Sequence, residues 1–355
     1  MVALYIASAE SSAGKTVLAL GLARRMAAEG LRVGYIRPLT AAAKQIESAQ
    51  TCAAVMKDSL GLLEPMEVLN PVIIDGAALE AIFAEKMGDL SEKVLESFRI
   101  ASTGKDITMV EGVSGLAEGA MVGLDAQTTA NLLDARCLLV LRARNEMVAD
   151  PILEFKKCMG GRMLGVVLNA VPMGMVEFAT ETLTPFLKKR GVKVYAVLPE
   201  DRLMMAVRVG ELVGRLGGRV ISGQSHMDDL VESVMVGAMS VENALTYFRR
   251  RANKAVITGG DRPDIQLAAL ETSTKCLILT GNLYPSPMIL GLADELVVPV
   301  ILAQQDTLTA AGLVEQAFSD VQFHQPKKIE HFERLLEAHL SYEELRRDLG
   351  LPARA

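Results

Sequence analysis

The stretch AESSAGKT, residues 9–16, contains residue types that could bind a phosphate group. It approaches the pattern G-x-x-x-x-G-K-[ST], in which backbone N–H groups and a helix N-terminus surround a phosphate. Lys15 can reach the outer phosphates, and the Thr16 hydroxyl can ligate a phosphate-bound magnesium ion. Ala9 stands where the pattern has its first glycine, which an alanine can replace if φ is negative there. The residues predicted to contact a nucleotide in this loop are Glu10, Ser11, Ser12, Ala13, Gly14, Lys15 and Thr16.

Two predicted elements flank this loop. The run ALYIAS, from Ala3 to Ser8, is short and apolar with β-branched and aromatic members, which predicts a buried strand. Apolar residues then recur at helical spacing between Lys15 and Glu29, and Gly30 follows where a left-handed cap residue belongs. A strand, a small-residue loop and a helix in this order favour a phosphate-binding loop over an ordinary strand-to-helix turn.

Further apolar runs alternate with helix-length segments along the first 200 residues. The strands predicted after the first are Leu31–Pro38, Asp106–Val113, Cys137–Arg144, Leu164–Val171 and Val192–Pro199, with a helix from about Ala41 to Leu60. Nearly continuous apolar strands with helical crossovers predict an α/β fold, in which helices cover both faces of a parallel sheet. Ligands of such sheets lie outside the carboxyl ends of the strands.

Three polar side chains fall at that edge of the predicted sheet. Glu111 could hold magnesium or order a water molecule, or it could be a solvated acid at a strand end. Arg37 could bind a γ-phosphate or a substrate carboxylate, or form a surface salt bridge. Asn169 could pair with an adenine edge, or cap the following turn. If the protein is an enzyme, Lys15, Arg37 and Glu111 are the candidate catalytic residues, and Thr16 and Glu111 are the candidate metal ligands.

Composition narrows the class of protein. With 355 residues the chain exceeds one comfortable core, so two domains are expected. No apolar run approaches a membrane span, no signal peptide is indicated, and the four cysteines show no C-x-x-C pair. We therefore expect a cytoplasmic protein with reduced thiols and no membrane partner. The net charge of −6, without a long basic block, argues against nucleic acid as a partner.

Several motifs, in chain order, resemble those of dethiobiotin synthetase and its relatives, phosphate-loop proteins that include the cobyrinic acid amide synthetases. The motifs are AESSAGKT, YIRP, VEGVSGL, GVVLNAVP and VLPED. The resemblance implies a P-loop NTPase-type domain with ATP and magnesium as cofactors. It implies that Lys15, Thr16 and Glu111 bind the phosphates and the metal. By the same resemblance, Asn169 reads the adenine.

Departures from this family concern the loop and the substrate end. Ala9 replaces the first glycine, Arg37 replaces a lysine and Ser114 replaces a glycine. The family's further magnesium-binding aspartate has no match in IESAQTCAAV, residues 46–55. The nucleotide end of the site is thus expected to be retained and the substrate end to be altered.

The residues after Asp201 change in character and predict a second, smaller α/β domain. The strands expected there are Ala255–Thr258, Cys276–Leu279 and Val297–Leu302. The segment from VGAMS to AVITGGDR is similar to the DRTGG domain, although Pro263 stands where that signature has threonine. The candidate ligand-binding residues are Thr258, Gly259, Gly260, Asp261 and Arg262. The alternatives are a generic strand-to-helix turn, or a cap for the helix that begins there.

This order of domains resembles the N-terminal half of long-form phosphate acetyltransferases, where the two domains are thought to regulate an acetyl-transferring domain. We expect a nucleotide-binding domain at residues 1–203, a DRTGG domain at 204–322, and a helix and tail at 323–355. No acetyl-transferring domain is expected in this chain, which would therefore not be a phosphate acetyltransferase by itself.

Two functions follow from these resemblances, and they leave open whether the chain is an enzyme. In the first, it is a nucleotide-binding sensor, with at most weak ATPase activity, that regulates a partner enzyme of acetyl-phosphate or acetyl-CoA metabolism. In the second, it is an ATP-dependent ligase that phosphorylates a carboxylate or carbamate and passes it to an amine. The altered substrate end and the DRTGG domain favour the sensor. A scaffold that has lost nucleotide binding also stays open, as does a homo-oligomer.

Overall fold

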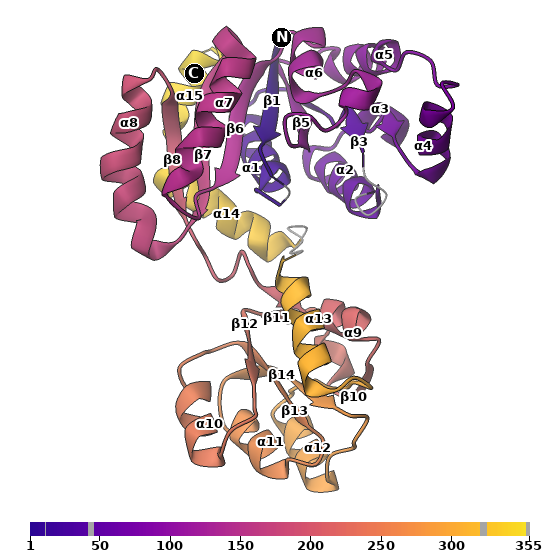
Figure 1. The fold of residues 1–355 in the computed structure, drawn as a ribbon, viewed down its shortest axis with the longest axis vertical. Helices are drawn as coiled ribbons and strands as arrows, with labels where there is room; N and C mark the ends of the chain where they lie inside the picture. Colours follow the sequence, from indigo (N-terminus) through magenta and orange to yellow (C-terminus); the bar gives the residue numbers. More distant parts are fainter. Residues whose placement is uncertain (11, 42–45, 320–324, 353–355) are drawn as a thin grey trace. The chain divides into compact units, whose positions relative to one another are not determined.

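Two units make up the fold of the computed structural model, which describes residues 1–10, 12–41, 46–319 and 325–352. Unit 1 combines Met1–Glu200 with Phe323–Ala355, and unit 2 is Asp201–Gln322 (Figure 1). Unit 2 is therefore an insertion in the sequence of unit 1. The C-terminal segment belongs to unit 1, which corrects the separate helix and tail expected from the sequence.

The central sheet of unit 1 has six parallel strands. Their order across the sheet is β2 (Val33–Ile36), β5 (Ile107–Ser114), β1 (Val2–Ser8), β6 (Arg136–Arg142), β7 (Met163–Val171) and β8 (Lys193–Pro199). All six correspond to strands predicted from the sequence, and the predicted α/β fold is confirmed. The strand β1 is buried along nearly its whole length, as a strand covered on both faces must be.

The helices of unit 1 cover this sheet. They are α1 (Lys15–Ala28), α2 (Ile46–Leu60), α3 (Met66–Leu69), α4 (Gly76–Phe83), α5 (Ser91–Ser102), α6 (Ala126–Leu132), α7 (Ala149–Met159), α8 (Thr184–Lys189), α14 (Pro326–His339) and α15 (Tyr342–Asp348). A short parallel pair, β3 (Leu39–Thr40) and β4 (Val72–Ile73), lies in the chain between β2 and α4. Gly30 follows α1 with φ +87°, the left-handed conformation expected of its cap.

The core of unit 1 follows the alternation of side chains along β1. Tyr5 shares a hydrophobic cluster with Phe98 of α5 and Phe155 of α7. Because successive side chains of a strand point to opposite faces, Leu4 and Ile6 face the other layer. Both are fully buried. The sheet is thus packed on both sides, which fixes its carboxyl edge as a rigid platform.

The C-terminal helices complete unit 1. Phe332 and Leu336 of α14 are buried, and a Cβ atom on Gly21 of α1 would lie 2.6 Å from Leu336. Arg346 of α15 donates a hydrogen bond of 2.9 Å to Glu29, and both side chains are less than a tenth exposed. The amphipathic pattern of this segment predicts a helix, but a pattern alone does not say which surface its apolar face covers.

Unit 2 contains a five-stranded sheet and a two-stranded pair. The larger sheet has the order β10 (Arg219–Ser222), β15 (Val300–Leu302), β14 (Thr274–Thr280), β13 (Lys254–Gly259) and β12 (Ser233–Val236), and the pair is β9 (Val207–Arg208) with β11 (Leu230–Val231). Only β10 runs antiparallel in the larger sheet. The sequence prediction omits β10 and β12, because four residues are too few to establish a period.

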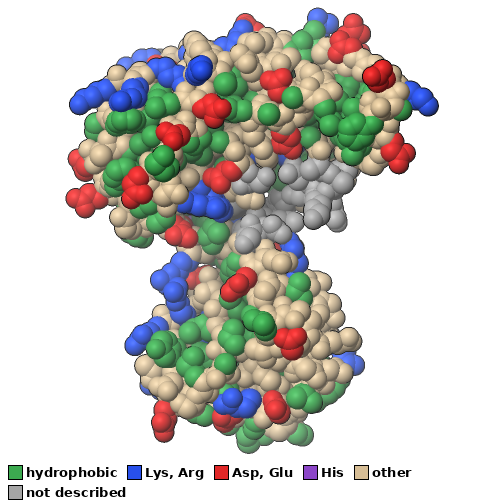
Figure 2. Space-filling model, in the orientation of Figure 1, with side chains coloured by type: hydrophobic (Ala, Val, Ile, Leu, Met, Phe, Trp, Pro, Cys, Tyr) green, Lys and Arg blue, Asp and Glu red, His purple; other side chains and the backbone are tan. Residues whose placement is uncertain are grey.

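The helices of unit 2 are α9 (Val209–Leu216), α10 (Val241–Phe248), α11 (Pro263–Leu270), α12 (Pro287–Glu295) and α13 (Thr307–Ser319). The strand β15 begins three residues later than expected, since Val297 has φ +58° and Pro299 lacks the N–H that a ladder needs. On the face shown in Figure 2, acidic and basic side chains are interspersed. Within the described ranges, no helix is long and apolar enough to cross a membrane.

Candidate functional site

The loop between β1 and α1 contains one glycine that the local geometry requires. Gly14 has φ +100°, and a Cβ atom there would lie 2.3 Å from Nδ2 of Asn169. Ser12 also has a positive φ, of +56°, whereas Ala9 does not, so position 9 needs no glycine. The departure of Ala9 from the phosphate-loop pattern therefore leaves the backbone unstrained. Ser11, one of the predicted loop residues, lies outside the described residues.

Lys15, the first residue of α1, is held at the carboxyl edge of the sheet by hydroxyl groups. Its Nζ donates to Oγ of Ser8 at 2.7 Å and to Oγ of Ser114 at 3.0 Å. Only 6% of Lys15 is exposed. Burial lowers the pKa of Lys15 to about 8, although the charge of Glu111 acts in the opposite direction. A buried ammonium bonded to hydroxyls, with no described carboxylate within 4 Å, can attract an anion.

Glu111 lies on β5 beside the phosphate loop and is 1% exposed. Its Oε1 accepts a hydrogen bond of 2.5 Å from the Thr16 hydroxyl, and its Oε2 accepts one of 2.7 Å from the Tyr35 hydroxyl. Arg37 pairs with Oε1 at 3.4 Å. A buried carboxylate is tolerated only when it is paired and hydrogen-bonded, and these three donors meet that need. The solvated strand-end acid, the alternative role for Glu111, is excluded by its burial.

Arg37 is also buried, with 8% exposed, and does not form the surface salt bridge considered from the sequence. Burial acts to lower the pKa of Arg37, but the charge of Glu111, together with Tyr35 and other nearby groups, outweighs it and the pKa is raised. Its Nε has no hydrogen-bond partner among the described residues. The backbone N–H of Arg37 donates to the carbonyl of Leu69 at 2.7 Å, and the next residue, Asn70, accepts a hydrogen bond of 3.0 Å from Thr40. In the part of the chain that the structure describes, Nδ2 of Asn70 is also buried without a partner, which leaves two buried donors unsatisfied.

Two of the predicted nucleotide contacts brace the loop. Nδ2 of Asn169 donates to the carbonyl of Ala13 at 2.9 Å, which ties the end of β7 to the loop. Oε1 of Glu10 accepts a hydrogen bond of 3.0 Å from the backbone N–H of Arg142, at the end of β6. These contacts fix the loop against the neighbouring strands. The Asn169 side chain thus has a positioning role in addition to any contact with a base.

Four further residues of this site escaped prediction as functional residues. Ser8 and Ser114 accept the hydrogen bonds from Lys15, and Tyr35 donates to Glu111. The carboxylate of Glu118 accepts a short hydrogen bond from the backbone N–H of Ser114. Ser8, Ser114 and Tyr35 lie on β1, β5 and β2, and their positions at the edge of the sheet could have identified them as candidate site residues. Glu118 lies beyond a strand, in SGLAEGA, and carried no such signal.

The glycine turn of unit 2 follows β13. Thr258 is 1% exposed, and its hydroxyl donates to the carbonyl of Gly237 at 3.2 Å. A Cβ atom on Gly260 would lie 1.8 Å from the carbonyl oxygen of Leu283. One on Gly259 would lie 2.3 Å from the Asp261 carboxylate. Gly260 is therefore required by close packing against the backbone, whereas the Asp261 side chain could move to admit a Cβ atom at position 259.

Arg262 is engaged at the start of α11. Its Nε and Nη2 donate to the two carboxylate oxygens of Asp264 at 3.0 and 2.9 Å, and Nη2 also donates to the carbonyl of Met239 at 3.2 Å. The fork of hydrogen bonds from Arg262 lowers the pKa of Asp264. Arg262 is the N-cap residue of α11, but its side chain makes no capping hydrogen bond and is bonded to Asp264 and Met239 instead.

Comparison with known protein families finds two matches along the chain. The AAA domain family (AAA_26) matches residues 2–208, and the DRTGG domain matches residues 211–317. The chain belongs to the AAA domain family. Its second match is a DRTGG domain, and the two matches confirm the predicted combination of a P-loop domain with a DRTGG domain.

The chain is also similar to phosphate acetyltransferases. It is 25% identical to that of Synechocystis sp. over 369 residues, covering 96% of this chain and 51% of the relative. It is 23% identical to that of Pseudomonas putida over 372 residues, covering 99% of this chain and 52% of the relative. The chain spans about half the length of the curated relatives it matches. The predicted resemblance to phosphate acetyltransferases is thereby confirmed.

Among solved structures, the chain is similar to the CBS and DRTGG domains of the regulatory region of Clostridium perfringens pyrophosphatase, in complex with the activator diadenosine tetraphosphate. The identity is 21%, the match covers 40% of this chain and 69% of the other, and the TM-score is 0.29.

Proposed function

We propose that unit 1 binds ATP with magnesium, and that the protein uses unit 2 to regulate an enzyme of acetyl-phosphate or acetyl-CoA metabolism in the cytoplasm. The observation that carries the nucleotide proposal is the buried charge at the start of α1. Lys15 and Arg37 are two buried cations against one buried carboxylate, Glu111. Together with the helix N-terminus, this excess suits a polyphosphate anion.

The magnesium part of the proposal rests on oxygen atoms at the same edge. The Thr16 hydroxyl and the Glu111 carboxylate lie 2.5 Å apart, and magnesium prefers oxygen ligands. Thr16 and Glu111 would hold the ion beside the phosphates, and the ion would neutralise phosphate charge. Lys15 would bind the outer phosphates, Asn169 would contact the adenine, and the loop residues Glu10 to Gly14 would supply backbone N–H groups.

The regulatory part is supported by the second match and by the relatives. A DRTGG domain accompanies the P-loop domain here, and the phosphate acetyltransferases align along nearly this whole chain. We place the ligand contacts of unit 2 at the carboxyl edge of its sheet, where the turn from Thr258 to Arg262 lies. A partner that responds to nucleotide requires coupling between the two units, and such coupling is reciprocal.

Calorimetry on the full chain tests the nucleotide proposal. ATP, ADP and GTP are titrated with and without magnesium, and we expect saturable adenine-nucleotide binding that tightens with the metal. Absence of saturable binding for every nucleotide would contradict it. For the regulatory part, a phosphate acetyltransferase from the same cells is assayed with the chain, with and without ATP. We expect the rate to change only with ATP; an unchanged rate would remove the proposed role.

One observation favours a second function, the ATP-dependent ligase. Within the described ranges, buried Nε of Arg37 and buried Nδ2 of Asn70 have no partners, and a small carboxylate or carbamate substrate could satisfy them. The test is release of ADP from ATP in a panel of carboxylates and amines. Strong stimulation by one of them would replace the sensor with the ligase.

A further inference from the structure

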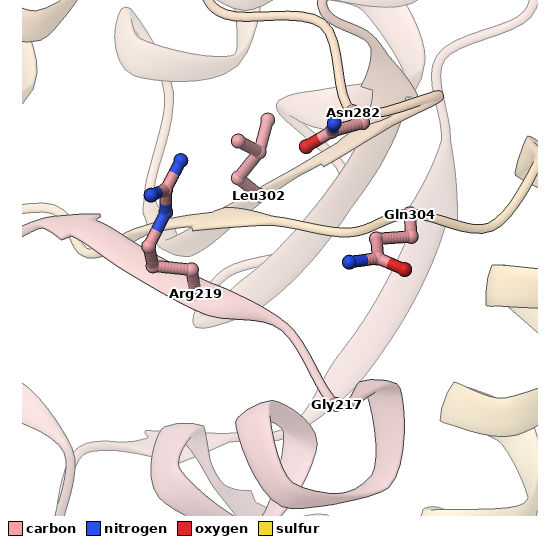
Figure 3. A pocket seen from close by; sticks show the side chains of 5 residues that line it. All are labelled: Gly217, Arg219, Asn282, Leu302 and Gln304. Atoms are coloured by element: carbon pink, nitrogen blue, oxygen red, sulfur yellow. The ribbon is translucent and has the colours of Figure 1, made fainter.

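Unit 2 contains a hollow of about 320 Å³ that none of the motifs identified. It is lined by Gly217, Arg219, Asn282, Leu302 and Gln304. Figure 3 shows the side chains of Arg219, Leu302, Asn282 and Gln304 around one common space. Leu302 ends β15, Asn282 follows the end of β14, and Arg219 begins the antiparallel β10. The hollow therefore lies at the carboxyl edge of the sheet, the edge where open α/β sheets bind ligands.

The two loops that carry the amide side chains are fixed by hydrogen bonds. The backbone N–H of Asn282 donates to the carbonyl of Ala303 at 2.9 Å, and that of Gly281 donates to Gln305 at 2.8 Å. Gln305 in turn donates through Nε2 to the carbonyl of Leu216 at 2.9 Å. Asn282 has φ +54°, which asparagine tolerates better than most residues. The backbone that carries the two amide side chains is thus held in place before any ligand arrives.

The charge of the residues that line the hollow indicates the class of ligand that it could bind. Arg219 is the one charged residue of the lining, and no carboxylate of the described residues forms an ion pair with it. Its guanidinium carbon lies 5.3 Å from the centre of the Tyr284 ring, a contact that can steady the side chain. A single guanidinium matches one carboxylate in geometry and in charge, whereas a phosphate monoester would bring almost twice the charge.

Size and polarity narrow the class further. Ligand pockets range from about 300 to 1,000 Å³, so this hollow suits a small metabolite and not a dinucleotide. Leu302 is a buried residue of the core of unit 2 and leaves little apolar surface in the lining, whereas the amides of Asn282 and Gln304 can each donate and accept a hydrogen bond. Arg219, Asn282 and Gln304 are all exposed, so binding in this open site would be weak and readily reversible.

We propose that this hollow binds a small carboxylate that also carries a hydroxyl or carbonyl group. Arg219 pairs with the carboxylate, and the amides of Asn282 and Gln304 bond to the second polar group. The inference names a ligand class for the sensing unit, and it rests on the proposed function only for the regulatory consequence. Binding itself requires neither nucleotide nor Lys15.

A ligand-observed NMR titration of the full chain tests this site, with lactate, acetate and inorganic phosphate as probes at constant ionic strength. We expect saturable binding of lactate that is stronger than that of acetate, because acetate lacks the second polar group. Arg219→Gln should weaken lactate binding about tenfold or more. Asn282→Gly removes the amide while suiting the positive φ, and should weaken lactate binding without affecting acetate. Arg249→Gln, at an exposed position directly after α10, is the matched control and should change nothing.

Three results would overturn the inference. One is equal lactate affinity in Arg219→Gln and the parent chain. Another is phosphate that binds more tightly than lactate and depends on Arg219, which would make the ligand a phosphate. The third is no saturable carboxylate binding up to about 20 mM. Repeating the titration in Lys15→Met without nucleotide separates this site from the nucleotide site, because lactate binding should persist there.

Discussion

The two sheets of the molecule present their carboxyl edges in different ways. In unit 1 the edge is charged and buried: Lys15, Arg37 and Glu111 are each less than a tenth exposed and are tied to one another or to hydroxyls. In unit 2 the charged group of the hollow, Arg219, is exposed. Buried charges are costly and persist where a highly charged ligand or a function repays them. The carboxyl edge of such a sheet can thus suit a highly charged anion, or an anion of lower charge that binds weakly and exchanges readily.

Two buried lysines sharpen this contrast. Burial lowers the pKa of Lys15 and of Lys254 to about 8. Lys254 begins β13, at the amino end of its strand, and donates to Oγ1 of Thr272 at 2.9 Å and to the carbonyl of Ser273 at 3.0 Å. Those bonds tie the start of β13 to the residues that follow α11, so Lys254 stabilises the fold. A lowered pKa alone therefore does not mark a ligand site, and the end of the sheet at which the lysine lies is what distinguishes the two.

The largest expected effect is the loss of stability when the C-terminal helices are removed from unit 1. A chain cut after Glu200 loses α14 and α15, which bury Phe332 and Leu336 against unit 1. Losing a large buried side chain costs about 2–5 kcal/mol, against a typical total stability of about 5–15 kcal/mol. We expect this chain to lose cooperative thermal unfolding in circular dichroism. A chain in which a flexible linker replaces residues 201–322 keeps those helices and should unfold cooperatively. Identical melting curves for the two would show that the C-terminal segment contributes little.

Lys15→Met should weaken magnesium–ATP binding about 100-fold or more, because it removes a charged donor from a buried site. The matched control is Lys254→Met, which removes an equally buried lysine from the other end of a sheet and should leave ATP affinity unchanged. Calorimetry measures both. If Lys15→Met binds ATP as well as the parent chain, the contrast between the two lysines has no functional meaning.

Nucleotide affinity should depend on pH through Lys15. Its charged form attracts phosphate, and with a pKa of about 8 that form is nearly complete at pH 7 and a minor species at pH 9. ATP affinity should therefore fall about tenfold between pH 7 and pH 9, and binding near pH 8 should take up protons. Calorimetry in two buffers of different ionisation enthalpy detects that uptake. A flat profile in the parent chain, or the same slope in Lys15→Met, would assign the effect to another group.

The smallest expected effect is that of Glu111→Gln. Because the amide keeps the size of the side chain but loses the charge, the magnesium concentration for half-maximal ATP binding should rise several-fold. Metal-free ATP should bind with little change. Tyr35→Phe is the control, since it removes a hydrogen bond to Glu111 and leaves the carboxylate in place. An unchanged magnesium titration in Glu111→Gln would remove Glu111 from the metal site.

The sequence predicts the fold of unit 1 well, because long apolar strands and the GKT turn are local signals. The sequence also indicates Glu111 and Lys15 as candidate site residues, since each follows or ends an apolar run at the ligand-binding edge of the sheet. The hydrogen bond from Tyr35 to Glu111 could not be predicted, because the partners of a side chain depend on the register of β2 against β5. The hollow around Arg219 was equally out of reach. It is formed by the edges of strands that include β10, whose four residues carry no periodic signal.

The bond between Arg346 and Glu29 joins positions 317 residues apart in the chain. During synthesis, α1 and its phosphate loop leave the ribosome long before the helices that cover them. At about 5–20 residues per second, translation of the residues between them separates the two events by tens of seconds, roughly 15 to 60. Through that interval the nascent first unit exposes the apolar surface around Gly21 that α14 later buries. Domains generally fold as they emerge, but here the inserted unit can finish folding before the unit that contains it.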